Sequence, residues 1–229
     1  GEKQSVSDYT LLKSAEGAAL TQEKWYVAES NAYFSNPVTV DGSVHIVLCD
    51  GVTVQAAKGI TLTEGNGLYV YSQSLGSNMG EIISVGRMGC AGIGAYTDTL
   101  NETVTNAGTL VINGGRISAY GGIGAAGIGG GFAGNGGTVI VNGGVVEAVG
   151  GLGNNSSLEA AGIGGGYGGE CGTVIINNVQ LLTSKGGRAL GAGLGCAASE
   201  TDITVNSALS VESGASENAI TSFECDGQE

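Results

Sequence analysis

The sequence is poor in proline and in basic residues, and each shortage excludes a class of protein. One proline and 45 glycines with no Gly-X-Y period exclude a collagen-like chain and a Pro-rich disordered chain. Eight lysines and arginines face 21 acidic residues, giving a net charge of −13. This charge argues against nucleic-acid binding, because phosphates require a basic surface. No run of about 18 apolar residues is present, so no transmembrane segment is expected.

The five cysteines form no Cys-X-X-Cys pair, and we therefore expect no metal site and no cofactor. The glycine-rich loops contain no aspartate, so nothing in them supports calcium binding either. An odd number of cysteines leaves at least one unpaired. The favoured pairing is Cys171 with Cys196, since both fall in loops of neighbouring repeats. The alternative is that most of the cysteines are small buried apolar residues.

Glycine is abundant, and its distribution reveals an internal repeat. A Gly-Ile-Gly phrase, or its Gly-Leu-Gly variant, starts at Gly92, Gly127, Gly162 and Gly193. A β-branched phrase of the type GTVIVNGG follows each of them, starting at Gly108, Gly137, Gly172 and Thr201. Each repeat divides into three short strands: a glycine-rich one, an alternating β-branched one, and an alternating one that ends in glycine.

Three short strands cannot bury an apolar face alone, whereas stacked repeats bury a continuous one. The sequence therefore predicts an all-β fold, a right-handed parallel β-helix of about six coils. Residues 38–59 and 60–86 follow the same plan without the glycines. Residues 1–36 lack the repeat and are predicted to form an N-terminal cap, whereas 37–229 form the β-helix repeats with a short acidic C-terminal end.

Asparagine recurs just after the second strand of each repeat, and we expect these side chains to stack as a hydrogen-bonded ladder. Its members are Asn113, Asn142, Asn177 and Asn206, with Asp50 at the corresponding place in an earlier coil. Strands in neighbouring coils lie about 4.8 Å apart, which suits hydrogen bonds between stacked side chains. The predicted role is structural, in satisfying the backbone of a tight bend.

The run HIVLCDGVTVQAAKGITLTEGNGLYVYSQS, followed by the AGIGGG and GTVIVNGG phrases, resembles the Gly-rich repeat region of extracellular surface proteins of anaerobic gut bacteria. The resemblance covers about residues 25–213 and implies export, a β-helix and display on the cell surface. Such regions are associated with adhesion or carbohydrate binding. The predicted fold is also similar to pectate lyases, in shape only.

One aromatic series stands out as a candidate ligand-binding site. Tyr96, Phe132 and Tyr167 follow the glycine-rich strands at nearly equal offsets, so Phe132 and Tyr167 should stack on adjacent coils. Aromatic faces beside a flat glycine surface suit sugar rings, whose length is close to the coil spacing of about 5 Å. Alternatively, these side chains stack on each other to shield a seam, or mediate self-association.

No catalytic constellation emerges from the sequence. The aspartates never occur in pairs, and His45, the only histidine, lies on a predicted strand without a partner. We therefore expect a non-catalytic, secreted or surface-displayed module for adhesion, with glycan recognition as the favoured activity. A host or bacterial surface protein is another partner to consider. The alternatives are a β-helix polysaccharide lyase or glycoside hydrolase, and a passive stalk.

Overall fold

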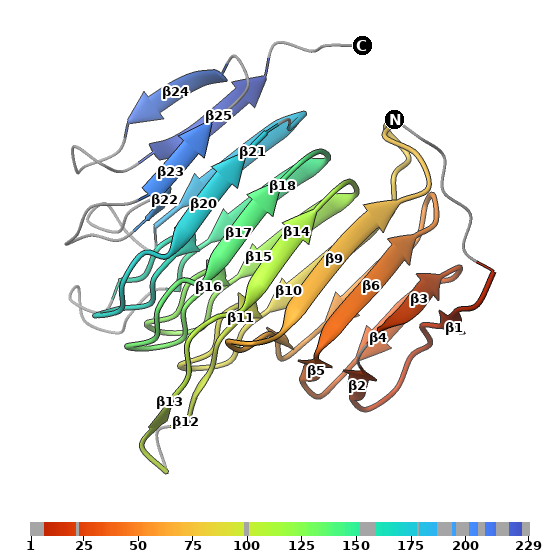
Figure 1. The fold of residues 1–229 in the computed structure, drawn as a ribbon, viewed down its shortest axis with the longest axis horizontal. Helices are drawn as coiled ribbons and strands as arrows, with labels where there is room; N and C mark the ends of the chain where they lie inside the picture. The colour runs from red at the N-terminus through yellow and green to blue at the C-terminus, as the bar shows by residue number, and fades with distance from the viewer. Residues whose placement is uncertain are drawn as a thin grey trace.

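A computed structural model describes residues 7–21, 23–98, 101–151, 159–177 and 179–186, together with the backbone of four later strands. The regular elements of these residues are all β-strands, which confirms the predicted all-β class. Most strands belong to three long sheets that run side by side through the molecule (Figure 1). No helix long and apolar enough to cross a membrane occurs in the described part of the chain.

The three sheets, here called A, B and C, contain eight, eight and seven strands. Sheet A consists, in spatial order, of β1 (Thr10–Leu11), β3 (Lys24–Ala28), β6 (Ser43–Leu48), β9 (Gly67–Ser72), β14 (Thr109–Ile112), β17 (Thr138–Val141), β20 (Thr173–Ile176) and β23 (Asp202–Val205). Sheet B consists of β4 (Ala32–Phe34), β7 (Thr53–Ala56), β10 (Glu81–Val85), β15 (Arg116–Tyr120), β18 (Val145–Val149), β21 (Leu181–Lys185), β25 (Ile220–Cys225) and β24 (Leu209–Ser213). Sheet C consists of β2 (Ala18–Thr21), β5 (Val38–Asp41), β8 (Ile60–Thr61), β11 (Ile93–Gly94), β16 (Ile128–Gly129), β19 (Ile163–Gly164) and β22 (Leu194–Gly195).

The chain visits sheets C, A and B in turn, and each strand pairs in parallel with its counterpart from the previous visit. Ile93 of β11 pairs with Ile128 of β16, which pairs with Ile163 of β19, so the Gly-Ile-Gly phrases stack directly. Six such rounds run from β2 to β21 in the described residues. The arrangement is consistent with the predicted solenoid. Antiparallel pairing occurs where β25 joins β21 and β24, and in the small hairpin of β12 (Thr97–Asp98) and β13 (Thr103–Val104).

Alternation along each strand creates the core between the sheets. In β6, Val44, Ile46 and Leu48 are buried, whereas the residues between them are partly exposed. Such β-branched, alternating segments favour strands with one buried face. Because the register is exact from coil to coil, the buried residues form columns, as in the series Ile82, Ile117, Val146 and Leu182 of sheet B. The core is therefore a continuous rod of aliphatic side chains.

The segment expected to form an N-terminal cap contributes strands to all three sheets. Strands β2, β3 and β4 pair in parallel with β5, β6 and β7. Residues 18–34 thus repeat the plan of the later coils, and the sheets show no break at residues 36 and 37. Only β1 and Ala15, which pair with Val27 and Phe34 at the edges of sheets A and B, extend beyond this round. The physical reason is that strand pairing needs alternation and register, and does not need the glycine phrases.

The glycines of the Gly-Ile-Gly phrases are needed for the close approach of successive coils. Gly129 has a φ of 127°, and a Cβ atom there would overlap the carbonyl oxygen of Gly164 in the next coil. Gly94 has the same relation to Gly129. Any side chain at these positions would therefore separate the coils and also strain the backbone.

We predict that Gly129→Ala lowers the free energy of unfolding by about 2 to 3 kcal/mol, because backbone strain and overlap with Gly164 act together. Chemical denaturation followed by circular dichroism measures this. Gly65→Ala is the matched control, since Gly65 also has a positive φ, of 86°, but has open space around its Cα. It should cost about 1 kcal/mol. Equal losses in the two variants would contradict the close-packing argument.

Candidate functional site

The asparagine series forms hydrogen bonds between coils. Asn142 donates from Nδ2 to Oδ1 of Asn113 at 2.8 Å, and Asn177 donates in the same way to Asn142 at 2.7 Å. All three side chains are partly buried at the turn between sheets A and B. Their amides therefore bond mainly to each other, as a structural ladder requires.

Asp50 and Asn206, the other two residues predicted to join the ladder, are not seen in this series of hydrogen bonds. Asp50 accepts a hydrogen bond from Oγ of Ser74 at 2.9 Å, and its backbone N–H donates to the side chain of Gln73. Its carboxylate is therefore used by the loop that follows β9. Asn206 lies outside the described residues.

The structure brings Phe132 and Tyr167 together, with ring centroids 5.6 Å apart and an interplanar angle of 31°. The Phe132 ring lies against the Cα of Gly124, and Tyr167 is 39 % exposed. Tyr96 makes no ring contact with either of them among the described residues. Its backbone is bound instead to the Thr105 hydroxyl. Only two of the three proposed aromatic residues thus form a pair, and much of the Phe132 surface is used in packing.

Of the cysteines, Cys171 is buried and forms a disulfide. Its partner lies outside the residues whose side chains the structure describes, so the pairing with Cys196 stays a prediction. Cys49 and Cys90 are free thiols, the first partly buried and the second buried.

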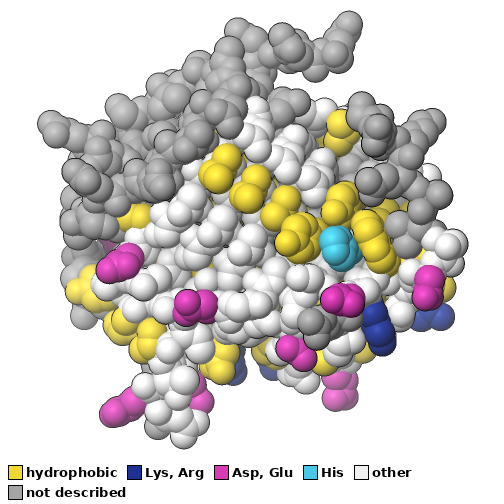
Figure 2. Space-filling view, in the orientation of Figure 1, with side chains coloured by type: hydrophobic (Ala, Val, Ile, Leu, Met, Phe, Trp, Pro, Cys, Tyr) yellow, Lys and Arg dark blue, Asp and Glu magenta, His cyan; other side chains and the backbone are white. Residues whose placement is uncertain are grey.

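A larger aromatic group, which sequence analysis did not predict, lies on the outer face of sheet A. Strand register aligns Trp25 of β3, His45 of β6 and Tyr69 of β9 in one outward column. The column continues with the aliphatic side chains of Val111, Ile140 and Ile175. Figure 2 shows this column as a diagonal row of yellow side chains that meets the cyan histidine.

The rings of this column stack face to face. The Trp25 and His45 centroids are 4.4 Å apart, and those of His45 and Tyr69 are 4.7 Å apart, with interplanar angles of 19° and 18°. Tyr71 lies beside the stack, with its hydroxyl 3.3 Å from Nδ1 of His45. Burial lowers the pKa of His45 from its ordinary value of 6.5 and raises that of Tyr71. Both shifts favour the neutral form of the side chain.

The stack ends at Tyr69, whose neighbour in the column, Val111, is only 8 % exposed. The next residue in the column is Val111, which has no ring, so the face of Tyr69 turned away from His45 has no aromatic partner among the described residues. The Tyr69 ring leans over Gly67, where a Cβ atom would lie 3.1 Å from Cε2. The neighbour of Gly67 in the next strand is Thr109. An aromatic face therefore borders the threonine at the start of β14.

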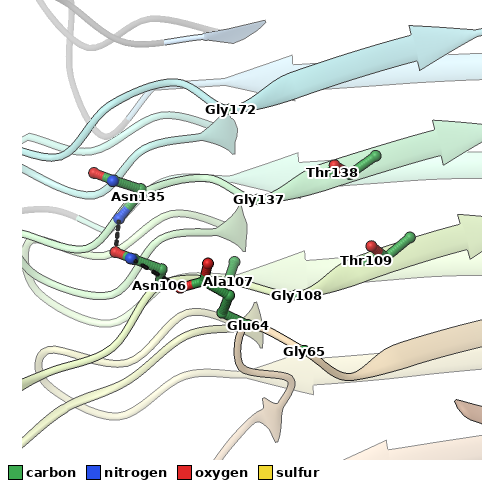
Figure 3. A pocket seen from close by; sticks show the side chains of 10 residues that line it. All are labelled: Glu64, Gly65, Asn106, Ala107, Gly108, Thr109, Asn135, Gly137, Thr138 and Gly172. Carbon is green, nitrogen blue, oxygen red and sulfur yellow. Dashed lines mark hydrogen bonds between the residues drawn. The ribbon is translucent and has the colours of Figure 1, made fainter. Parts of the chain in front are cut away.

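A polar groove of about 330 Å³ begins at this threonine (Figure 3). Its lining comes from four successive coils and consists of Glu64, Gly65, Asn106, Ala107, Gly108, Thr109, Asn135, Gly137, Thr138 and Gly172. Because equivalent positions of neighbouring coils line it, the groove runs along the stacking direction of the coils. Its only ionisable side chain is the exposed carboxylate of Glu64.

Two asparagines shape the groove by binding the turns between sheets C and A. The side chain of Asn106 donates to Glu64 at 3.3 Å and accepts from the backbone N–H of Asn135 at 3.2 Å. Asn135 accepts from the backbone N–H of Glu170 at 2.9 Å. These contacts link consecutive coils, so the wall of the groove is held in register.

A second group of interest lies on the outer face of sheet B. Ser118 donates to Glu81 at 3.2 Å, and Tyr120 donates to Glu147 at 3.0 Å. Ser118 and Glu147 are direct neighbours on adjacent strands, whereas Glu81 pairs with Arg116, so the two carboxylates lie in different columns of the sheet. Burial raises the pKa of Tyr120, and its hydrogen bond to Glu147 and the charges of both glutamates raise it further.

These groups were missed for identifiable reasons. The aspartates are not paired in the sequence, and the two carboxylates on sheet B belong to glutamates, Glu81 and Glu147, on two different strands. His45 was expected to have no partner because it is the only histidine, and the register of β3 with β6 that brings Trp25 to it was not foreseen. The alternation of Tyr69 and Tyr71 was the available signal.

Comparison with known proteins gave no match to a protein family, to a curated protein or to a solved structure. In the described part of the chain, no three His, Cys, Asp or Glu side chains are arranged to hold a metal ion.

We predict that the imidazole of His45 titrates below pH 6.5, because burial between Trp25 and Tyr69 disfavours its charged form. As the only histidine, it gives an unambiguous NMR titration. Since the unfolded chain takes up this proton first as pH falls, the stack should lose stability below about pH 6.5. Trp25→Ala should move the midpoint back toward 6.5. A midpoint at or above 6.5 in the unmodified protein would contradict the stacked, desolvated position.

Proposed function

We propose that this chain is a right-handed parallel β-helix that serves as a non-catalytic glycan-binding module on the outer face of sheet A. The cyclic order of the sheets and the parallel pairing of each strand with its predecessor support the β-helix. Parallel crossover connections within a sheet are almost always right-handed, which supports the handedness.

The observation that carries the function is the partly exposed Tyr69 ring at the end of the aromatic stack, beside the groove. A sugar unit presents an apolar C–H face and a rim of hydroxyl groups. The exposed part of the Tyr69 ring suits the first, and the hydroxyls, amides and carboxylate of the groove suit the second. Trp25 and His45 support Tyr69 from behind and limit its motion, so that less conformational entropy is lost when a ligand binds.

Charge favours a ligand without acidic groups. The groove lining contains Glu64 and no basic residue, and the sequence carries a net charge of −13. The negative charges of an anionic polysaccharide would be repelled by the Glu64 carboxylate, because no basic side chain in the groove lining compensates them. The proposed ligand is therefore an uncharged glycan.

An extracellular location is part of the proposal. The disulfide of Cys171 supports it, because disulfides persist in oxidising compartments. The relation to glycine-rich surface proteins of gut bacteria stays a prediction from the repeat phrases.

A glycan array on the purified protein tests the function directly. We expect binding of uncharged glycans, reduced at least about ten-fold by Tyr69→Ala, since a buried aromatic contact contributes about 1.5 kcal/mol. Tyr69→Leu keeps the apolar bulk and the fold, and should also lose affinity.

Tyr167→Ala is the matched control, because it removes an exposed aromatic residue from the other pair. Loss of binding in this control, with Tyr69→Ala unaffected, would place the site on the Phe132 and Tyr167 pair. A blank array would overturn the proposal and favour a passive stalk or a module that binds a protein.

The second candidate is a polysaccharide-active enzyme, and the observation that favours it is the glutamate pair on sheet B. General acid and base catalysis at a glycosidic bond uses two carboxylates on opposite sides of the bond. Here each carboxylate accepts a hydrogen bond, from Ser118 or Tyr120, and the pair lies on a different sheet from the aromatic stack.

We expect no release of reducing ends when the protein is incubated with neutral or acidic polysaccharides, because the proposed binding face lacks such a pair. Turnover that disappears in Glu147→Gln would overturn the non-catalytic proposal. Thr183→Val, at the position next to Glu147 in β21, controls for disturbance of the sheet.

A further inference from the structure

The outer face of sheet A carries a column of threonines beside the aromatic column. Strand register aligns Thr109, Thr138 and Thr173 in three successive coils. All three side chains are partly exposed, and two of them line the groove. Within the part of the chain that the structure describes, their hydroxyls have no hydrogen-bond partner. The column thus offers one available hydroxyl per coil.

The spacing of these hydroxyls is set by the sheet. Strands in neighbouring coils lie about 4.8 Å apart, so the column repeats at this distance. One unit of an extended β-1,4-linked sugar chain advances by nearly the same length. A polysaccharide that lies along the coils would therefore meet an equivalent threonine at each unit.

The groove runs along the stacking direction of the coils, as a polysaccharide lying along the threonine column would require. Glu64, Asn106 and Asn135 come from three successive connections between sheets C and A, and the groove follows them from coil to coil. It starts where Tyr69 leans over Gly67, next to Thr109. The aromatic face and the threonine column are therefore continuous, and one chain can contact both.

Resting on the proposed glycan-binding function, we propose that the ligand is a neutral, unbranched β-1,4-linked polysaccharide that lies along the coil axis. Its terminal unit contacts Tyr69, and the following units donate to or accept from Thr109, Thr138 and Thr173 in order. The Glu64 carboxylate accepts from sugar hydroxyls and repels uronic acid units. A branch would meet the apolar side chains of Ile140 and Ile175 or the wall formed by Asn106 and Asn135.

Calorimetric titration with cello-, manno- and xylo-oligosaccharides of two to six units tests this inference. Affinity for at least one series should rise with length as successive units reach the threonines. Thr138→Val should reduce affinity for the longer oligosaccharides about five-fold and leave that of the disaccharide unchanged, because one hydrogen bond contributes about 1 kcal/mol. Valine has the same shape and favours strands, so the fold is expected to persist.

Thr183→Val makes the same change on the outer face of sheet B and should have no effect. Oligogalacturonides of equal length should bind at least about ten-fold more weakly than the neutral series. Equal binding of both would overturn the assignment to neutral chains. Affinity that is independent of length, or unaffected by Thr138→Val, would overturn the axial mode while Tyr69→Ala still tests the function. Absence of binding to any glycan would remove both proposals.

Discussion

In-register parallel pairing between equivalent strands of successive coils is the constraint on which the rest of this structure depends. Ile93 lies over Ile128, and Asn113 lies beside Asn142, because the backbone hydrogen bonds of sheets C and A allow no other alignment. A shift by one residue would move every buried side chain to the surface. Each column therefore favours the same residue type in successive coils. This preference explains why the sequence repeats.

The same constraint organises the surface. Side chains that point outward from sheet A are as regularly spaced as those of the core, so the face carries parallel columns of aromatic, aliphatic and hydroxyl groups. The aromatic column changes to aliphatic between Tyr69 and Val111, so the ring stack ends at Tyr69. A repeating face of this kind suits a repeating ligand. The outer face of sheet B differs, because it carries the carboxylates Glu81 and Glu147, each of which accepts a hydrogen bond from a neighbouring hydroxyl.

Sequence patterns predicted the repeating part of the molecule well and the side-chain contacts on the outer face of sheet A poorly. The three strands per repeat and the asparagines after the second strand were visible because glycine and β-branched phrases mark them. Residues 18–34 were assigned to a cap because they lack these phrases, although they pair with the next coil in all three sheets. Without these phrases the stack was not visible in the sequence, since Trp25 and His45 meet through the register of β3 and β6.

The sequence by itself determined that the chain is all-β and that a unit of three short strands, marked by glycine phrases, repeats along it. These properties follow from local conformation and from spacing along the chain. The tertiary structure decided which surface residues meet, such as Trp25 with His45 and Thr109 with Thr138. Contacts of that kind depend on register between coils that are distant in sequence, and no local pattern encodes which outward columns come to lie side by side.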